Sequence, residues 1–304
     1  MKQVVIISGK GGTGKTVIAG SFASLANQKV MADCDVDAAD LHLLLHPIIK
    51  ERHEFSGGKE AVIDKDICTG CKKCMEVCRF EAIREAGSEK RGMLKQVQHD
   101  IVEIDSISCE GCGVCAYICP EQAIQMEKAV NGEWYISDTK YGTLVHAKLG
   151  IAGENSGKLV TVVRQNAKLL ADRESANYII IDGPPGIGCP VIASIGGTDL
   201  ALVVTEPTLS GIHDMERVIG VARHFGIKTV VCVNKYDLNL KNTQVIEEYC
   251  QESNIKVIGK IPFDKIVIEA LVKEMPVVEY SDSISASEIR DLWNKVQDEL
   301  RDGN

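Results

Sequence analysis

Residues 9–16 read Gly-Lys-Gly-Gly-Thr-Gly-Lys-Thr, and no other segment constrains the fold of this chain as strongly. The octapeptide fits the pattern G-x-x-x-x-G-K-[ST], in which backbone N–H groups and a lysine surround nucleotide phosphates. The apolar run Val4–Ile7 before it predicts a buried parallel strand, and the residue spacing over Thr16–Ala26 predicts a helix. A strand, a glycine-rich loop and a helix in this order predict a P-loop, and a chance glycine-rich turn is the alternative.

The loop itself supplies the expected phosphate contacts. Glycine lets backbone N–H groups turn towards phosphate oxygens, and the N-terminus of the following helix favours an anion. We expect Lys15 to reach the β- and γ-phosphates and the Thr16 hydroxyl to bind Mg²⁺. The residues expected around the phosphates are Gly9, Lys10, Gly11, Gly12, Thr13, Gly14, Lys15 and Thr16.

The composition excludes several classes of protein. A chain of 304 residues with 45% hydrophobic residues has room for two domains, or for one domain with an insertion. Its net charge of −9 argues against nucleic-acid binding. The sequence contains no apolar run of about 18 residues and no segment like a signal peptide, which predicts a cytoplasmic protein without membrane insertion. Twelve cysteines in such a chain favour metal or redox chemistry over disulfides.

Eight of the twelve cysteines form two copies of the pattern C-x2-C-x2-C-x3-C. The copies begin at Cys68 and Cys109, 41 residues apart, and Gly, Ala and Ile recur at equivalent positions within them. The first run consists of Cys68, Cys71, Cys74 and Cys78, and the second of Cys109, Cys112, Cys115 and Cys119. The chain therefore contains an internal repeat that is built around cysteine.

This spacing is typical of bacterial two-cluster ferredoxins, in which the fourth cysteine of each run binds the other cluster. It predicts one [4Fe–4S] cluster on Cys68, Cys71, Cys74 and Cys119, and a second on Cys109, Cys112, Cys115 and Cys78. Structural zinc, which also uses C-x2-C pairs, is the alternative. Arg79 replaces the usual proline after the first run, and we interpret the polar stretch 87–100 between the runs as a hairpin or loop.

Further apolar runs that alternate with helical patterns predict a doubly wound, mostly parallel α/β sheet, with ligands at the carboxyl ends of the strands. Carboxylates follow two of these runs, at Asp33–Asp40 and at Asp182. Asp182 is placed to support Mg²⁺, whereas Asp33, Asp37 and Asp40 are interpreted as loop carboxylates or helix caps. The predicted P-loop domain covers 1–56 and 129–304, and an inserted small α+β ferredoxin-like domain covers 57–128.

The whole chain resembles the MinD/ParA/Mrp group of deviant P-loop ATPases, in particular members with a two-cluster ferredoxin insert, and more distantly the nitrogenase iron protein. The segments that carry the resemblance are the cysteine runs, Gly9–Thr16, Asp33–Asp40, Asp182–Pro190, Thr205–Thr208, Asn234–Asp237 and Ile261–Asp264. It implies a homodimer, or a heterodimer with a related ATPase, in which Lys10 reaches the partner's nucleotide. By the same resemblance, Asp35 orients or activates the attacking water beside Lys15.

The resemblance also indicates residues around the base, namely Asn234, Pro262 and Asp264. Residues Asn234–Asp237 have the N-K-x-D form with which many GTPases recognise guanine, so GTP stays open although the resemblance favours ATP. Cys189 stands where the nitrogenase iron protein has a ligand to a bridging cluster. Because no companion cysteine is present in the aligned stretch, we interpret it as a buried or switch-associated thiol.

Two expectations concern the remaining segments. Cys34, Cys232 and Cys250 lie in core-like runs and are predicted to be buried. From Ser287 onwards the apolar residues have helical spacing, and acids outnumber bases on the polar side, which favours docking on the chain's own domain over a membrane.

The predicted function is that of an ATP-binding and ATP-hydrolysing iron–sulfur protein. A nucleotide-switched dimer would couple ATP turnover to electron transfer, or to assembly or reductive activation of a metallocofactor on a client protein. One alternative is a MinD/ParA-like spatial-organisation ATPase whose clusters are structural or redox-sensing, and another is an iron–sulfur cluster carrier. The sequence does not name the client metalloprotein or the electron donor.

Overall fold

The computed structural model describes residues 1–86, 102–150 and 155–301. The loop expected at 87–100 lies outside the described residues. The chain divides into two compact units, which we call the main unit (residues 1–53, 133–149 and 156–304) and the inserted unit (residues 54–132 and 150–155). These boundaries differ by a few residues from the expected ones at 56/57 and 128/129.

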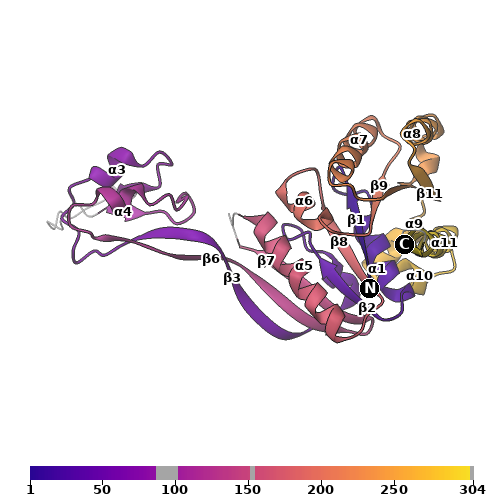
Figure 1. The fold of residues 1–304 in the computed structure, drawn as a ribbon, viewed down its shortest axis with the longest axis horizontal. Coiled ribbons are helices and arrows are strands. Elements are labelled where there is room, and N and C mark those ends of the chain that lie inside the picture. The colour runs from indigo at the N-terminus through magenta and orange to yellow at the C-terminus, as the bar shows by residue number, and fades with distance from the viewer. Residues whose placement is uncertain (87–101, 151–154, 302–304) are drawn as a thin grey trace. The chain divides into compact units, whose positions relative to one another are not determined.

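Among the described residues, nine strands form one sheet in the order β11-β10-β9-β1-β8-β2-β7-β6-β3 (Figure 1). From β11 to β7 each strand runs parallel to its neighbours, so the prediction of a mostly parallel α/β sheet is confirmed. These strands are apolar because helices cover both of their faces. The strands are β1 (Lys2–Ser8), β2 (Lys29–Asp33), β3 (Ile48–Ile63), β6 (Ile124–Thr139), β7 (Gly142–Leu149), β8 (Tyr178–Pro185), β9 (Leu200–Thr205), β10 (Thr229–Asn234) and β11 (Lys256–Ile261).

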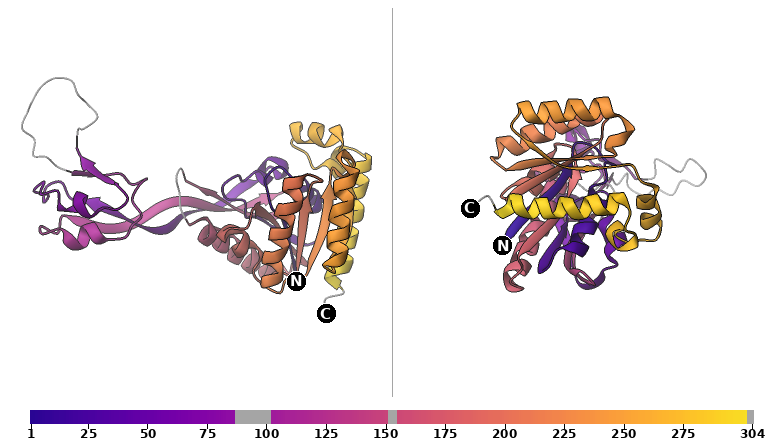
Figure 2. Two further views of the ribbon diagram at one scale, coloured as in Figure 1. Left: turned by 90° about the horizontal axis from the view of Figure 1, so that it is seen from above. Right: turned by 90° about the vertical axis from the view of Figure 1, so that its right-hand side faces the viewer.

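Helices pack on both faces of this sheet (Figures 1 and 2). Val4 and Ile6 of β1 point to the face covered by α1 and α11, whereas α5, α6 and α7 pack against strands from the other face. The helices are α1 (Lys15–Leu25), α2 (Leu41–Leu45), α5 (Ser156–Arg173), α6 (Cys189–Ile195), α7 (Leu209–His224), α8 (Leu240–Glu252), α9 (Lys265–Val272), α10 (Val277–Tyr280) and α11 (Ile284–Arg301), with a 3-10 turn at Tyr236–Leu238.

Helix α11 packs against the main unit along its apolar side. Trp293 is 4% exposed, and its ring centroid lies 4.8 Å from that of Phe22 in α1. The other apolar residues of this side, Ile289, Leu292, Val296 and Leu300, are also buried. The prediction that this segment docks on its own domain is confirmed. None of the described helices is long and apolar enough to cross a bilayer.

The inserted unit contains the two cysteine runs, each ending in a short helix. Its elements are α3 (Lys73–Val77), α4 (Val114–Ile118) and an antiparallel pair, β4 (Ile83–Glu85) and β5 (Val102–Ile104). Left-handed φ values recur at equivalent positions in the two runs: Gly70 with Gly111, Lys72 with Gly113, and Glu81 with Gln122. The sequence repeat is therefore also a repeat of backbone conformation.

Candidate functional site

The glycine-rich loop connects β1 to α1 at the carboxyl edge of the sheet. Gly12 and Gly14 have φ values of 79° and 93°, a region that favours glycine. A Cβ on Gly14 would lie 2.4 Å from the amide nitrogen of Asn234, and one on Gly9 would lie 2.3 Å from the Cβ of Asp214. Close approach of neighbouring segments therefore requires glycine at both positions.

Two carboxylates lie side by side where β2 and β8 end. The parallel register pairs Asp33 with Asp182, and both residues are almost completely buried. The Asp33 carboxylate accepts hydrogen bonds from the backbone N–H groups of Asp35 (3.1 Å) and Leu41 (3.3 Å). Of the two interpretations of Asp33, the loop carboxylate is wrong, because its side chain is buried and fixes the loop that carries Asp35, whereas its bond to the N–H of Leu41, the first residue of α2, agrees with a helix cap. Only its position at a strand end could have indicated this role.

Asp182 has the properties of a cation ligand. Within the described residues, neither oxygen of its carboxylate has a hydrogen-bond partner. Burial raises the pKa of Asp182 to about 7, although the Lys15 ammonium and the Thr16 hydroxyl act in the opposite direction. The Thr16 hydroxyl is near enough to act on the carboxylate but makes no well-formed hydrogen bond with it, so the buried charge is poorly compensated, and a divalent cation with oxygen ligands relieves that cost. The residues present therefore fit Mg²⁺ between Thr16 and Asp182.

Asp35 and Lys15 lie close enough to influence each other. Partial burial raises the pKa of Asp35, and the positive charge of Lys15 lowers it. Lys15 is 5% exposed, so its ammonium is held within the site and not in bulk water. The structure therefore brings Lys15, Thr16, Asp35 and Asp182 together at one edge of the sheet, and their roles in catalysis and Mg²⁺ binding stay predictions.

A cavity of about 170 Å³ adjoins the P-loop on the side of α9. The predicted base residues Asn234, Pro262 and Asp264 all line it, together with Gly12, Gly14 and apolar residues of α1 and α9. The amide of Asn234 is already engaged, since its Nδ2 donates to the Thr13 carbonyl oxygen at 2.9 Å and its Oδ1 accepts from the Lys235 N–H. Asp264 caps α9 by accepting from the N–H of Ile266.

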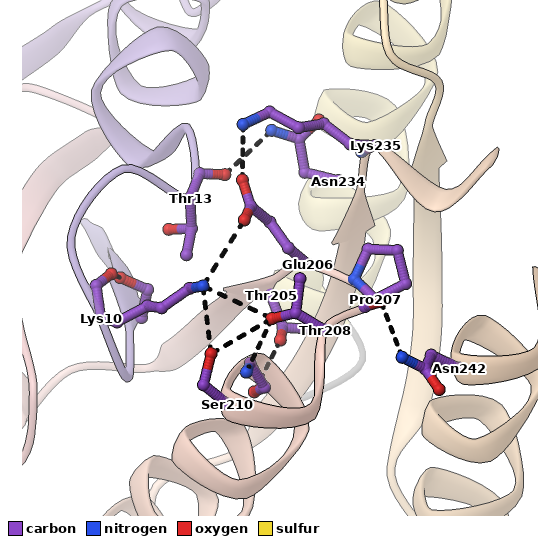
Figure 3. A network of polar contacts seen from close by, with 12 residues as sticks. Lys10, Thr13, Thr205, Glu206, Pro207, Thr208, Ser210, Asn234, Lys235 and Asn242 are labelled. Atoms are coloured by element: carbon purple, nitrogen blue, oxygen red, sulfur yellow. Dashed lines mark hydrogen bonds and ion pairs between the residues drawn. The ribbon is translucent and has the colours of Figure 1, made fainter. Parts of the chain in front are cut away.

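Lys10 contacts the loop that follows β9 in its own chain (Figure 3). Its Nζ lies 3.4 Å from the Thr208 hydroxyl, 3.3 Å from the Ser210 hydroxyl and 3.8 Å from an oxygen of Glu206. The other oxygen of Glu206 pairs with Lys235 at 2.5 Å. Sequence reasoning assigned no role to Glu206, which joins two lysines of the site. The expected contact of Lys10 across a dimer stays a prediction.

The eight repeated cysteines line two separate cavities in the inserted unit. One cavity is lined by Cys68, Cys71, Cys74 and Cys119, and the other by Cys78, Cys109, Cys112 and Cys115. Each cavity thus contains three cysteines of one run and the fourth cysteine of the other. Apolar side chains such as Ile83, Val102 and Ile124 pack around the same cysteines.

Hydrogen bonds between the runs explain this crossed arrangement. The N–H of Asp64, before the first run, donates to the carbonyl of Ala123, after the second, at 2.7 Å. The N–H of Asp105, before the second run, donates to the carbonyl of Ala82, after the first, also at 2.7 Å. Because the start of each run is bonded to the end of the other, the fourth cysteine is carried into the opposite cavity.

The thiols do not form a closed metal site in this structure. In residues 1–86, 102–150 and 155–301, no three His, Cys, Asp or Glu side chains converge as they do around a bound metal ion. Burial raises the pKa of Cys74 and of Cys115, and neighbouring cysteines of the same run add to the shift. Four thiols per cavity, surrounded by apolar residues, form a donor set that fits an iron–sulfur cluster, and zinc is compatible with four cysteines as well.

The remaining cysteines lie in the main unit. Cys34, Cys232 and Cys250 are buried, as predicted. Cys189 is the first residue of α6 and is exposed, so the interpretation of it as a buried thiol is wrong. A Cβ on Gly157 of α5 would lie 3.1 Å from the Cβ of Cys189, which places this thiol beside the start of α5.

Comparisons with known proteins agree with this arrangement of P-loop and sheet. An uncharacterised protein of Methanocaldococcus jannaschii, MJ0578, is 32% identical over 308 residues, which cover 97% of this chain and 96% of that protein. A putative septum site-determining protein MinD of Mesostigma viride is 26% identical over 91% of this chain and 76% of its own length. The structure of septum site-determining protein MinD from Pyrococcus horikoshii, complexed with Mg-ADP, superposes with a TM-score of 0.58 at 18% identity, over 97% of this chain and 95% of that one. Residues 4–277 match the CobQ/CobB/MinD/ParA nucleotide binding domain, and the chain therefore belongs to that family.

Proposed function

We propose that this protein is a nucleotide-switched ATPase whose inserted unit carries two [4Fe–4S] clusters. In this proposal ATP turnover is coupled to electron transfer, or to assembly or reductive activation of a metallocofactor on a client protein. The observation that carries the proposal is the pair of four-cysteine cavities, each with its fourth cysteine supplied by the other run.

The main unit supplies the ATPase residues. Lys15 neutralises the β- and γ-phosphates, and Thr16 and Asp182 hold Mg²⁺. Asp35 orients the attacking water, and the hydrogen bonds that the Asp33 carboxylate accepts from the N–H groups of Asp35 and Leu41 keep the loop of Asp35 in position. The support for this assignment is that these side chains converge at the edge of the sheet that carries the P-loop.

The two lysines of the P-loop have different tasks in the proposal. Lys15 stays buried in its own site, whereas Lys10 is a third exposed and rests on Glu206 of its own chain. We propose that Lys10 leaves this contact when two subunits associate around ATP and then binds the nucleotide of the partner subunit. An ATP-dependent dimer formed in this way gives the protein two states that nucleotide controls.

The inserted unit supplies the thiolates. Cys68, Cys71, Cys74 and Cys119 would hold one cluster, and Cys109, Cys112, Cys115 and Cys78 the other. When bound, such clusters supply one-electron transfer. Apolar residues pack around the cysteines of each cavity, and the hydrogen bonds donated by the N–H groups of Asp64 and Asp105 keep the two runs in register.

A second candidate function is that of a spatial-organisation ATPase of the MinD type, with structural or redox-sensing clusters. The similarity to MinD proteins over most of the chain favours it. The first function requires nucleotide to change what happens at the inserted unit, whereas a spatial-organisation ATPase with purely structural clusters does not.

Electron transfer to an artificial acceptor tests the coupling. Anaerobically reduced protein is mixed with an oxidised viologen in the presence of MgATP, MgADP or no nucleotide. The rate at which the protein is oxidised is followed through the reduction of the viologen. We expect MgATP to change this rate, and Lys15→Ala to abolish the nucleotide effect without changing the iron content. An identical rate in all three conditions would contradict coupling. ATP-dependent dimerisation that is insensitive to the redox state would then favour the MinD-type function with structural clusters, and loss of iron to an apo-ferredoxin would favour a cluster carrier.

A further inference from the structure

The segment that follows β10 has the form of a guanine-reading motif. Residues Asn234, Lys235 and Asp237 supply its N-K-x-D pattern. In such a motif the carboxylate accepts two hydrogen bonds from the adjacent N–H donors of guanine, which requires both oxygens to face the base. The position of the Asp237 carboxylate therefore decides which purine this motif can recognise.

In this structure the Asp237 carboxylate binds the chain itself. Its Oδ1 accepts a hydrogen bond from the backbone N–H of Phe263 at 2.7 Å. Phe263 lies between Pro262 and Asp264, and all three residues line the base cavity, whereas Asp237 does not. The Asp237 carboxylate thus binds the loop that forms one wall of the cavity and does not face the base.

The other two side chains of the motif are also bound within the chain. The Asn234 amide joins the P-loop to its own turn, through Thr13 and the Lys235 N–H. The Lys235 ammonium pairs with Glu206 (Figure 3). The motif therefore fastens the P-loop, the loop after β9 and the loop after β11 to the end of β10.

We propose that Asp237 is a positioning residue that fixes the loop of residues 262–264 as one wall of the base cavity, and that the cavity so formed selects adenine over guanine. This inference depends on the proposed nucleotide-binding function. Guanine would bring two adjacent N–H donors to a site whose carboxylate is already engaged. An unpaired donor against a mostly apolar lining weakens binding strongly, whereas adenine presents one donor and one acceptor, which backbone groups of a loop can satisfy.

Affinities for four ligands test the inference. Dissociation constants are measured by calorimetry for MgATP, MgGTP, magnesium xanthosine triphosphate and magnesium tripolyphosphate, on the full chain and on Asp237→Asn and Asp237→Ala. We expect the unmodified protein to bind ATP at least about tenfold more tightly than GTP, since two donors of guanine would stay unpaired.

The two variants separate positioning from base contact. Asparagine keeps an oxygen that accepts the Phe263 N–H, so Asp237→Asn should leave the ATP affinity within about threefold. Asp237→Ala should weaken ATP binding about fivefold to tenfold, the loss of one hydrogen bond to a charged group, and leave tripolyphosphate binding unchanged. Asp172→Ala, at an exposed position on α5, is the matched control, and urea unfolding shows that each variant is folded.

Three outcomes would overturn the inference. If Asp237 contacted the base, the unmodified protein would prefer GTP, and Asp237→Asn would gain affinity for xanthosine triphosphate, because xanthine carries an acceptor where guanine carries an amino group. An unchanged ATP affinity in Asp237→Ala would show that the hydrogen bond to Phe263 is not needed to hold the loop 262–264 for binding of the base. Tripolyphosphate binding that is absent, or unaffected by Lys15→Ala, would instead refute the nucleotide site itself.

Discussion

Replacing Asp182 by asparagine should make the protein without nucleotide and Mg²⁺ more stable and at the same time weaken its binding of MgATP. Asp182 is 1% exposed, and its two oxygens have no hydrogen-bond partner among the described residues. Burial raises its pKa to about 7, from an ordinary value of 3.8. Between these two pH values the unfolded chain has released a proton that the folded chain still holds, so the folded state loses stability as the pH rises.

The size of the effect follows from the width of that interval. About three pH units at about 1.4 kcal/mol each correspond to roughly 4 kcal/mol, lost between about pH 4 and pH 7. Asparagine has nearly the same shape but does not ionise. Asp182→Asn should therefore be more stable than the unmodified protein by up to about 4 kcal/mol at pH 8, and the difference should shrink to within about 1 kcal/mol near pH 4.

Urea unfolding at several pH values measures this difference. Both tryptophans of the chain, Trp134 and Trp293, belong to the main unit, so their fluorescence reports its unfolding. Asp37→Asn, at an exposed position of the neighbouring loop, is the matched control and should change the stability little at any pH. A stability difference for Asp182→Asn that is absent at pH 8, or independent of pH, would refute the reasoning, as would an unchanged affinity for MgATP.

The remaining predictions concern the P-loop and a buried histidine. Gly9→Ala should destabilise the main unit by about 1–3 kcal/mol in urea, because its Cβ would lie 2.3 Å from that of Asp214. Gly11→Ala, whose Cβ would have no atom of the described residues within 4 Å, should change the stability by less than about 1 kcal/mol. Equal effects of the two variants would contradict this steric argument. The Nε2 of His146 shares one hydrogen bond with the Ser137 hydroxyl at 2.9 Å. Burial lowers the pKa of His146 from 6.5 to about 4, and the charge of His42 adds a smaller effect in the same direction. Between pH 6.5 and pH 4 the unfolded chain binds a proton at this histidine that the folded chain does not, so the folded state loses stability as the pH falls. His146→Gln should remove up to about 3 kcal/mol of this loss. Plots of unfolding free energy against pH that run parallel for the two proteins would refute this.

Much of the fold could be predicted because the sequence signals are local. The apolar run Val4–Ile7, the glycine loop and the helical spacing after it determine β1, the P-loop and α1 without any information from elsewhere in the chain. The same holds for α11, whose apolar residues recur at helical spacing and are buried against α1. The crossed sets of cysteines could be predicted because, at this spacing, the fourth cysteine of each run joins the other set. The sequence contained no sign of the hydrogen bonds donated by the N–H groups of Asp64 and Asp105, which bring the crossed arrangement about.

The parts that could not be predicted depend on strand register and on side-chain partners. Asp33 looked like one of several loop acids, and only the pairing of β2 with β8 shows that it is buried next to Asp182. Asn234 lines the cavity expected for the base, but no local pattern indicates that its amide also holds the P-loop, since this contact depends on β10 ending directly against Gly14. Cys189 was expected to be a buried or switch-associated thiol, and of these two alternatives burial is wrong, because Cys189 lies exposed at the start of α6. Such contacts join segments far apart in the chain and leave no periodic pattern in the sequence.

In the proposed function, the two cysteine runs hold two [4Fe–4S] clusters in crossed sets. The most direct test is the content of iron, zinc and acid-labile sulfide per chain after anaerobic purification. We predict about eight iron and eight sulfide per chain, and about half of each in Cys78→Ser or in Cys119→Ser, with Cys250→Ser as the buried control outside the runs. A variant in which Cys68, Cys71 and Cys74 are serine has lost the first cluster. In that background Cys119→Ser should remove no further iron, because Cys119 belongs to the lost cluster, whereas Cys78→Ser should remove the iron of the second cluster. Zinc in place of iron, or a Cys78→Ser variant that loses no iron in that background, would contradict the account.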